Sequence, residues 1–164
     1  MMYMENIQIL GFKGSINSIG ETLDLIDEIK EDGEIIQLLN ADSIVSKNHI
    51  IHGVNQALLA FERGENLAKD LSVEIALRCS AQRQISKAFK ILGLKEGQMN
   101  LCAILINSKD HTSELSEIFN LDDGVFECYD ENIIKIYKIS SQELENMSLE
   151  EIVIDRITKL TVDY

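Results

Sequence analysis

The chain has 164 residues, 45% of them apolar, which predicts one domain spanning residues 1–164 around one hydrophobic core. The formal net charge of −13 argues against nonspecific binding to nucleic acid, because lysine and arginine must neutralise phosphates in such binding. The apolar runs are far shorter than the roughly 20 residues that cross a bilayer, and no basic segment followed by a hydrophobic one opens the sequence. We therefore expect a cytoplasmic protein that makes no membrane contact.

The first third of the chain predicts two strands with a helix between them. Apolar residues on both sides of Gly11 predict a strand with a bulge, and residues 34–40 predict a second strand. Residues 21–30 carry apolar side chains at helical spacing, and Gly33 follows as a stop signal.

The central third is predicted to be helical. Residues 49–62 and 67–78 repeat apolar side chains at helical spacing. A third helix is indicated by a stripe at i, i+3, i+4 and i+7 that is expected to face the core, namely Ile85, Ala88, Phe89 and Leu92. Ser80 is the candidate N-cap of this helix, and Gly93 stands at its far end.

The last third supplies the element that sets the fold class. Residues 99–106 form a nearly continuous apolar run of strand length, which is typical of a central strand covered on both faces. Helical patterns follow at residues 113–119, 132–137 and 149–160. Ser140 and Ser148 each stand three residues before a glutamate, the spacing of a capping box. We predict a mixed α/β (α+β) fold, a single helix-rich domain with a small mixed or antiparallel sheet.

Positive charge is concentrated in one stretch of this acidic chain. Residues 78–95 contain five lysines and arginines and no acidic residue. On a helix Arg83, Lys87 and Lys90 fall within a sector of about 60°, opposite the apolar stripe. Solvated helix faces usually mix both signs of charge, so a single-signed face indicates an anionic partner, either RNA or an acidic protein surface. An ordinary solvated charged face is the alternative interpretation.

Other chemistries find little support in the sequence. His49 and His52 have the i, i+3 spacing of a helical metal pair, which would suit a metal-dependent hydrolase, but no third ligand stands at a recognisable spacing. The three cysteines match neither a CxxC motif nor a disulfide framework. Neither a nucleophile elbow nor a phosphate-binding glycine loop is present. We predict no catalytic residue, no metal site and no cofactor.

Residues 49–97 resemble the small Cgi-type subunit of the KEOPS complex, a family known in eukaryotes as PRPK-binding protein. The similarity lies in the HIIHGVNQALLAFERG helix, in the E-x-x-x-R-x-S-x-x-R-Q-I stretch that begins at Glu74, and in the ILGLKEG turn. The rest of the chain follows the same succession of elements more loosely.

The resemblance implies a non-catalytic subunit of a heteromeric complex that modifies tRNA to threonylcarbamoyladenosine. Such a subunit contacts the kinase-like ATPase of the complex, captures the 3′ CCA end of tRNA and leaves catalysis to another subunit. The RNA-contacting residues that it implies are Ile75, Arg78, Ser80, Arg83 and Gln84, with Lys87 and Lys90 extending the phosphate track.

The surface for the kinase is less well marked in the sequence. Ile154 and Val162 lie off the apolar stripe of the final predicted helix, so they are candidates for kinase contact. A protein-interaction module that regulates a kinase without touching RNA is the alternative function.

Overall fold

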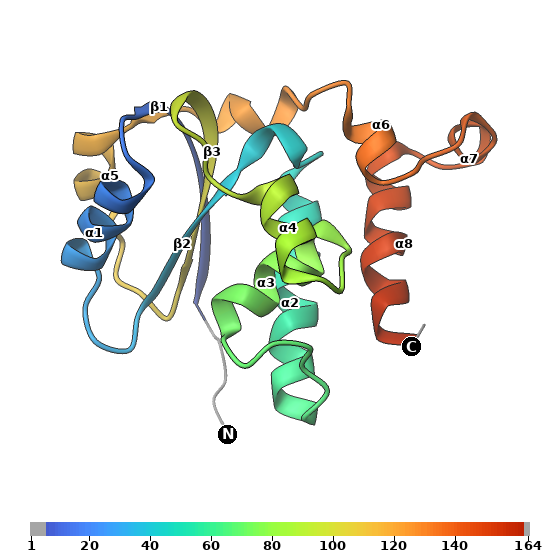
Figure 1. Ribbon diagram of the computed structural model, residues 1–164, viewed down its shortest axis with the longest axis horizontal. Helices are drawn as coiled ribbons and strands as arrows, with labels where there is room; N and C mark the ends of the chain where they lie inside the picture. Colours follow the sequence, from blue (N-terminus) through green and yellow to red (C-terminus); the bar gives the residue numbers. More distant parts are fainter. Residues whose placement is uncertain (1–5, 163–164) are drawn as a thin grey trace.

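A four-stranded antiparallel sheet forms the middle layer of the molecule (Figure 1). The computed structural model describes residues 6–162, except for the side chain of Val162. The strand order is β2-β3-β1-β4. The strands are β1 (Ile7–Ile16), β2 (Ile35–Asn40), β3 (Gly97–Ile106) and β4 (Asn120–Leu121).

Helices cover both faces of this sheet and confirm the predicted α+β fold. One face packs against α1 (Ile19–Ile29) and α5 (Thr112–Ile118). The other packs against α2 (Lys47–Arg63), α3 (Leu71–Ser80) and α4 (Ile85–Leu92). Beyond α2 lies α8 (Leu149–Val162), on the side of the molecule away from the sheet (Figure 1). The short elements are the 3-10 helices η1 (Ala41–Ser43) and η2 (Asp123–Glu127) and the helices α6 (Ile133–Ile136) and α7 (Ser141–Asn146).

The central position predicted for the third strand is confirmed. β3 pairs with β1 from Ile106 to Gly97 and with β2 from Ile106 to Leu101. Its side chains from Leu101 to Ile106 are all at most 1% exposed. A strand with neighbours on both edges and helices on both faces has no position for a polar side chain, which explains the unbroken apolar run.

The predicted bulge at Gly11 is wrong, because the β1–β3 register advances one residue at a time through this position. Gly11 serves a close approach instead. A Cβ atom there would lie 2.6 Å from the side chain of Val125 and 2.7 Å from the carbonyl oxygen of Asp122. The absence of a side chain therefore lets η2 pack directly onto the strand.

Most helix ends lie close to the predicted positions, but α3 begins at Leu71 and not at residue 67, and α4 begins without the predicted cap. Ser140 and Ser148 both make the reciprocal bonds of a capping box, as predicted. Ser80, in contrast, is the last residue of α3, where its hydroxyl donates to the carbonyl of Leu77. The left-handed Ala81 ends α3, and Gln84 is the N-cap of α4.

The predicted core stripe of α4 is only half buried. Ala88 and Leu92 are fully buried, whereas Ile85 and Phe89 are 52% and 40% exposed. The helix has eight residues and packs chiefly on α3, so a narrower strip of its surface is covered than the heptad-like spacing suggested.

A buried histidine joins the start of β2 to the segment after β3. The Nε2 atom of His111 lies 2.8 Å from a carboxylate oxygen of Glu34, and its Nδ1 atom lies 2.8 Å from one of Glu114. Ionised carboxylates only accept hydrogen bonds, so the two contacts favour the protonated ring, in which both nitrogens donate. The bonds to Glu114 and Glu34 raise the pKa of His111 above its ordinary value of 6.5.

This arrangement predicts a pH-dependent stability. Because the pKa of His111 is higher in the folded state, its contribution is complete below pH 6.5 and is lost as the pH rises through the raised value. Backbone N–H donors lower the pKa of Glu34 to about 2, so its own contribution stays constant above pH 4.5. We expect urea denaturation from about pH 6 to about pH 9 to show a smaller loss of stability in a His111→Gln variant than in the wild type. Equal slopes in the two proteins would contradict the assignment.

Candidate nucleic-acid interface

The outer surface of α4 carries the predicted cations. Lys87 and Lys90 are exposed, and within residues 6–162 no carboxylate pairs with either of them. Gln84 is exposed at the start of the helix. Arg83 is also exposed but lies before the helix begins, where its guanidinium donates to the carbonyl of Leu160 at the end of α8 (3.2 Å). Lys87 and Lys90 are therefore exposed side chains of α4, whereas Arg83 is held by α8.

Three other residues of the predicted RNA-contacting set are buried. Ile75 and Ser80 are 0% exposed and Arg78 is 1% exposed. Ile75 packs in the core between the helices and the sheet, and the Ser80 hydroxyl is satisfied within its own helix. In this conformation Ile75 and Arg78 have no surface that RNA could touch, whereas Ser80 lines a hollow beside α6, so RNA contact by these three residues stays a prediction.

Arg78 is held inside by a carboxylate one helical turn earlier. Its Nε atom donates to Glu74 (2.8 Å), and its terminal nitrogens donate to the Thr161 hydroxyl of α8 (3.3 Å) and the Glu65 carbonyl (3.4 Å). The other carboxylate oxygen of Glu74 accepts the backbone N–H groups of Leu67 and Ala68. The pair thus ties together α3, the α2–α3 loop and the end of α8.

The two histidines of α2 pack the helix and do not form a metal pair. His49 is fully buried, and its Nδ1 atom accepts the N–H of Val45 while its Nε2 atom donates to the carbonyl of Cys79 (2.7 Å). Burial lowers the pKa of His49 to about 4, which keeps the ring neutral. His52 bonds instead to the Thr158 hydroxyl of α8.

Within the described part of the chain, one group of side chains has metal-like spacing, namely Glu31, Glu34 and His111. The carboxylate and imidazole groups of these three residues already have partners within the protein. The imidazolium of His111 bonds to Glu34, and Lys109 forms an ion pair with Glu31 (2.8 Å). The contacts present make this cluster an ion-pair network.

Two hollows that the sequence did not reveal lie between the α3–α4 region and α6. They have one lining residue in common, Ile136. The first, of about 210 Å³, is lined by Ser80, Ala81, Gln82, Ile136, Tyr137, Lys138 and Arg156. The second, of about 250 Å³, is lined by Asn40, Asp42, Ser43, Lys90, Ile91, Lys95, Asp130, Asn132 and Ile136. We call this feature the α4–α6 groove.

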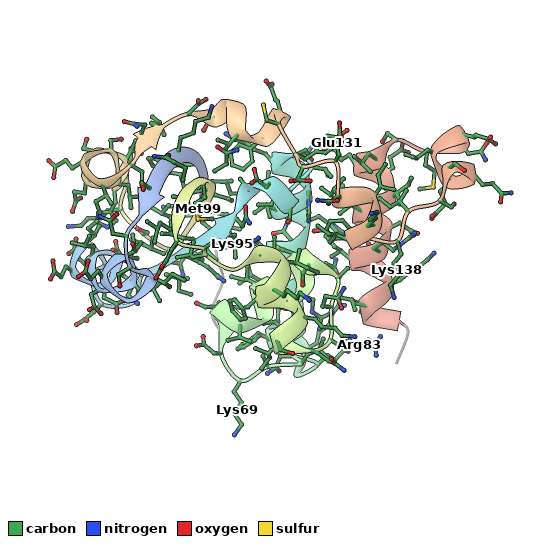
Figure 2. All side chains as sticks on the ribbon, turned by 45° about the horizontal axis from the view of Figure 1, so that its top comes forward. Lys69, Arg83, Lys95, Met99, Glu131 and Lys138 are labelled. Atoms are coloured by element: carbon green, nitrogen blue, oxygen red, sulfur yellow. The ribbon has the colours of Figure 1, made fainter. Side chains whose placement is uncertain are left out.

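Cations from distant parts of the chain meet at this groove. Arg156 of α8 donates to the carbonyls of Tyr137 and Lys138 and to the carboxylate of Glu143 (2.8 Å), which fixes the loop after α6. The bond from Arg156 and the backbone N–H of Ser140 lower the pKa of Glu143 to about 2. Figure 2 shows Arg83 and Lys138 on the flank where α8 lies and Lys95 nearer the middle of the molecule. Sequence reasoning counted Lys95 in the basic stretch but had no signal for Lys138 or Arg156.

Comparison with known proteins matches the chain to one protein family. Residues 16–159 match the family model described as kinase binding protein CGI-121. The regulatory protein Cgi121 of Methanocaldococcus jannaschii is 35% identical over 118 residues, which cover 69% of this chain and 77% of that protein. The EKC/KEOPS complex subunit TPRKB of Danio rerio is 29% identical over 114 residues, 65% of each chain. The EKC/KEOPS complex subunit CGI121 of Debaryomyces hansenii is 31% identical over 123 residues, and this chain spans 57% of its length.

The burial of Arg78 predicts a structural role that a stability measurement can detect. Arg78→Ala leaves the Glu74 carboxylate buried without its charged partner, so we expect a loss of about 3–5 kcal/mol in the free energy of unfolding. Lys87→Ala, on the surface, is expected to change it by less than about 0.5 kcal/mol. Urea denaturation of both variants is the test.

A double variant keeps the structural role testable if Arg78→Ala does not fold. Glutamine at position 74 still accepts the N–H groups of Leu67 and Ala68, so Glu74→Gln combined with Arg78→Met is expected to recover stability relative to Arg78→Ala. Equal stability of Arg78→Ala and Lys87→Ala would refute the structural role.

Proposed function

The chain belongs to the CGI-121 family, and we propose on this basis that it is a non-catalytic subunit of a KEOPS complex that binds the kinase-like ATPase of that complex. Two of its relatives are named EKC/KEOPS complex subunits and a third is named a regulatory protein. The family match spans residues 16–159, so it includes both the cationic surface of α4 and helix α8.

We further propose that the chain binds tRNA and captures its 3′ CCA end. The observation that carries this proposal is the pair of exposed lysines on α4 that have no carboxylate partner within residues 6–162, although the chain has 28 acidic residues. Surface lysines on an acidic protein readily form ion pairs, so a cationic surface kept clear of carboxylates favours an anionic ligand.

The residues proposed to touch RNA are the exposed members of the predicted set. Arg83, Gln84, Lys87 and Lys90 are exposed and are retained. Ile75, Arg78 and Ser80 are assigned an indirect role, because they hold α3 and the turn that presents Arg83. Cations of this kind hold the phosphates and give affinity, whereas base identity must be read elsewhere.

Charge reversal on α4 tests tRNA binding. We expect Lys87→Glu and Lys90→Glu each to weaken tRNA binding. Lys87→Ala is expected to reduce the slope of log affinity against log salt concentration by about 1, because one phosphate contact is lost. Lys69→Glu is the matched control, because Lys69 is exposed in the α2–α3 loop and projects from another part of the molecule (Figure 2). Filter binding at several salt concentrations measures the affinity of all four variants.

Removal of the CCA end from tRNA tests recognition of this end separately. tRNA without its CCA end is expected to bind more weakly than intact tRNA. Equal binding of the two would reject capture of the end. Absence of any tRNA binding would favour the alternative function, a protein module that regulates the kinase without RNA contact.

Helix α8 is proposed as part of the kinase-binding surface. Ile152, Val153 and Ile157 point into the core and are fully buried, whereas Ile154 is partly exposed. Val162 ends the helix, and its side chain lies outside the part of the chain that the structure describes. An apolar residue on the exposed side of a helix contributes to a protein interface when a partner covers it.

Substitution of Ile154 tests this surface. We expect Ile154→Arg to reduce copurification of the kinase-like subunit while tRNA binding by the isolated chain is unchanged, because a charge would be buried without a partner in the interface. Ile134→Arg is the matched control, since Ile134 is a 40% exposed isoleucine on α6. Full copurification of the kinase with the Ile154 variant would place the interface elsewhere.

A further inference from the structure

The two edges of the sheet differ in how they are protected. At one edge β4 has only two residues, and the outward backbone groups of Gly11 in β1 are capped. The Gly11 N–H donates to the Asp123 carboxylate (3.0 Å), and its carbonyl accepts the N–H of Asp122 (2.8 Å). At the other edge β2 has six residues with neither a charge nor a proline, and it pairs with β3 without a bulge. Short length, charges, prolines and bulges are what keep edge strands from pairing with other chains, so β2 is open to such pairing.

The outward backbone groups of β2 belong to Ile36 and Leu38. Every second residue of an antiparallel strand bonds to its neighbour, and the residues between point their N–H and C=O groups to the opposite edge. The Asn107 N–H donates to the Asn6 carbonyl, which fixes this alternation across β1, β3 and β2. Gln37 therefore bonds to β3, whereas Ile36 and Leu38 face outward and keep 9% and 7% of their surface exposed. No hydrogen bond from elsewhere in residues 6–162 reaches the backbone groups of these two residues.

We propose that β2 pairs antiparallel with β2 of a second copy of this chain, about a twofold axis at Gln37. Ile36 of each copy then exchanges backbone hydrogen bonds with Leu38 of the other, and the sheet continues through both molecules. A twofold contact needs a surface that is complementary to itself, and a strand with outward groups on two alternate residues meets this condition. The inference goes beyond the proposed function and does not depend on it.

The side chain of Gln37 gives an independent reason to expect a partner at this edge. It is 8% exposed, and its Nε2 atom donates to the Ser72 carbonyl of α3 (2.8 Å). Among the buried side-chain nitrogens and oxygens that the structure describes, its Oε1 atom alone has no hydrogen-bond partner. In the proposed pair the two Gln37 side chains lie opposite each other on the same face of the sheet, where cross-strand side chains are closest. Nε2 has a second N–H, so the glutamine of each copy can donate to the Oε1 atom of the other.

The charges at the two ends of β2 favour the antiparallel direction. Residues 30–34, which lead into the strand, contain one lysine and three acidic residues, a net charge of −2. The hollow at the other end, beside Asn40, is neutral because it is lined by two lysines and two aspartates, namely Lys90, Lys95, Asp42 and Asp130. Parallel pairing would bring two acidic ends together, whereas antiparallel pairing brings each acidic end beside exposed lysines.

Self-association of the wild-type chain is the first test. Because one strand from each copy makes a small interface, we expect a weak dimer that sedimentation velocity detects as the concentration rises from about micromolar to about millimolar. Amide exchange measured by NMR locates the contact. The N–H groups of Ile36 and Leu38 are expected to exchange about tenfold more slowly when about nine tenths of the chains are paired, since exchange then proceeds from the remaining monomer. The N–H of Gln37, which faces β3, is expected to be protected at every concentration.

Two outcomes of this experiment overturn the proposal. A monomer at every concentration excludes pairing between copies and leaves the edge to a strand from another protein. A dimer in which the exchange of Ile36 and Leu38 does not change with concentration places the contact elsewhere.

Charges at position 37 test the twofold axis. We expect Gln37→Glu and Gln37→Lys each to weaken the dimer by about tenfold or more, because like charges then face each other across the axis, and an equimolar mixture of the two variants to restore pairing. Asn120→Glu is the matched control, since it puts the same charge on β4 at the opposite edge of the sheet and is expected to leave the dimer intact. Thermal unfolding confirms that each variant is folded. Wild-type dimerisation of either folded variant alone, or a mixture of folded variants that stays monomeric, overturns the axis at Gln37.

Discussion

The buried ion pair of Glu74 and Arg78 is the interaction on which the arrangement of the surface depends. The two side chains are 0% and 1% exposed, and each makes further hydrogen bonds that compensate its removal from water. Through Thr161 the pair positions the end of α8. That helix in turn holds Arg83 through the Leu160 carbonyl and the loop after α6 through Arg156. Both sides of the α4–α6 groove are therefore placed, in part, by one charge pair in the interior.

The same pair explains why the E-x-x-x-R-x-S-x-x-R-Q-I motif divides into two roles. Its first half lies in α3, where the i, i+4 spacing of glutamate and arginine allows them to bond inside the protein. Its second half follows the left-handed Ala81 and is exposed. A motif identifies residues that act together, but it does not say which of them face solvent. The i, i+4 spacing of Glu74 and Arg78 is present in the sequence, but Arg78 was predicted to contact RNA instead.

Elements whose patterns are local were predictable, and features that depend on distant contacts were not. The central strand and the capping boxes at Ser140 and Ser148 follow from short-range patterns, and both are present. The exposure of Phe89 depends on how much of α4 the neighbouring α3 covers, which periodicity cannot give. The groove could not be predicted from the sequence, because Gln82, Lys138 and Arg156 come together only through the packing of α6 and α8 against the α3–α4 turn.

The strongly acidic body of the protein has a consequence for the kind of RNA that it can admit. A duplex or a folded RNA lying flat on the surface would bring its phosphates near carboxylates outside the cationic stretch, at a cost that grows with the area of contact. A single-stranded end can enter a narrow cationic site while the rest of the molecule stays away. Under the proposed function, the net charge of −13 is therefore not an obstacle to RNA binding. It favours protruding ends over broad contact with a folded RNA.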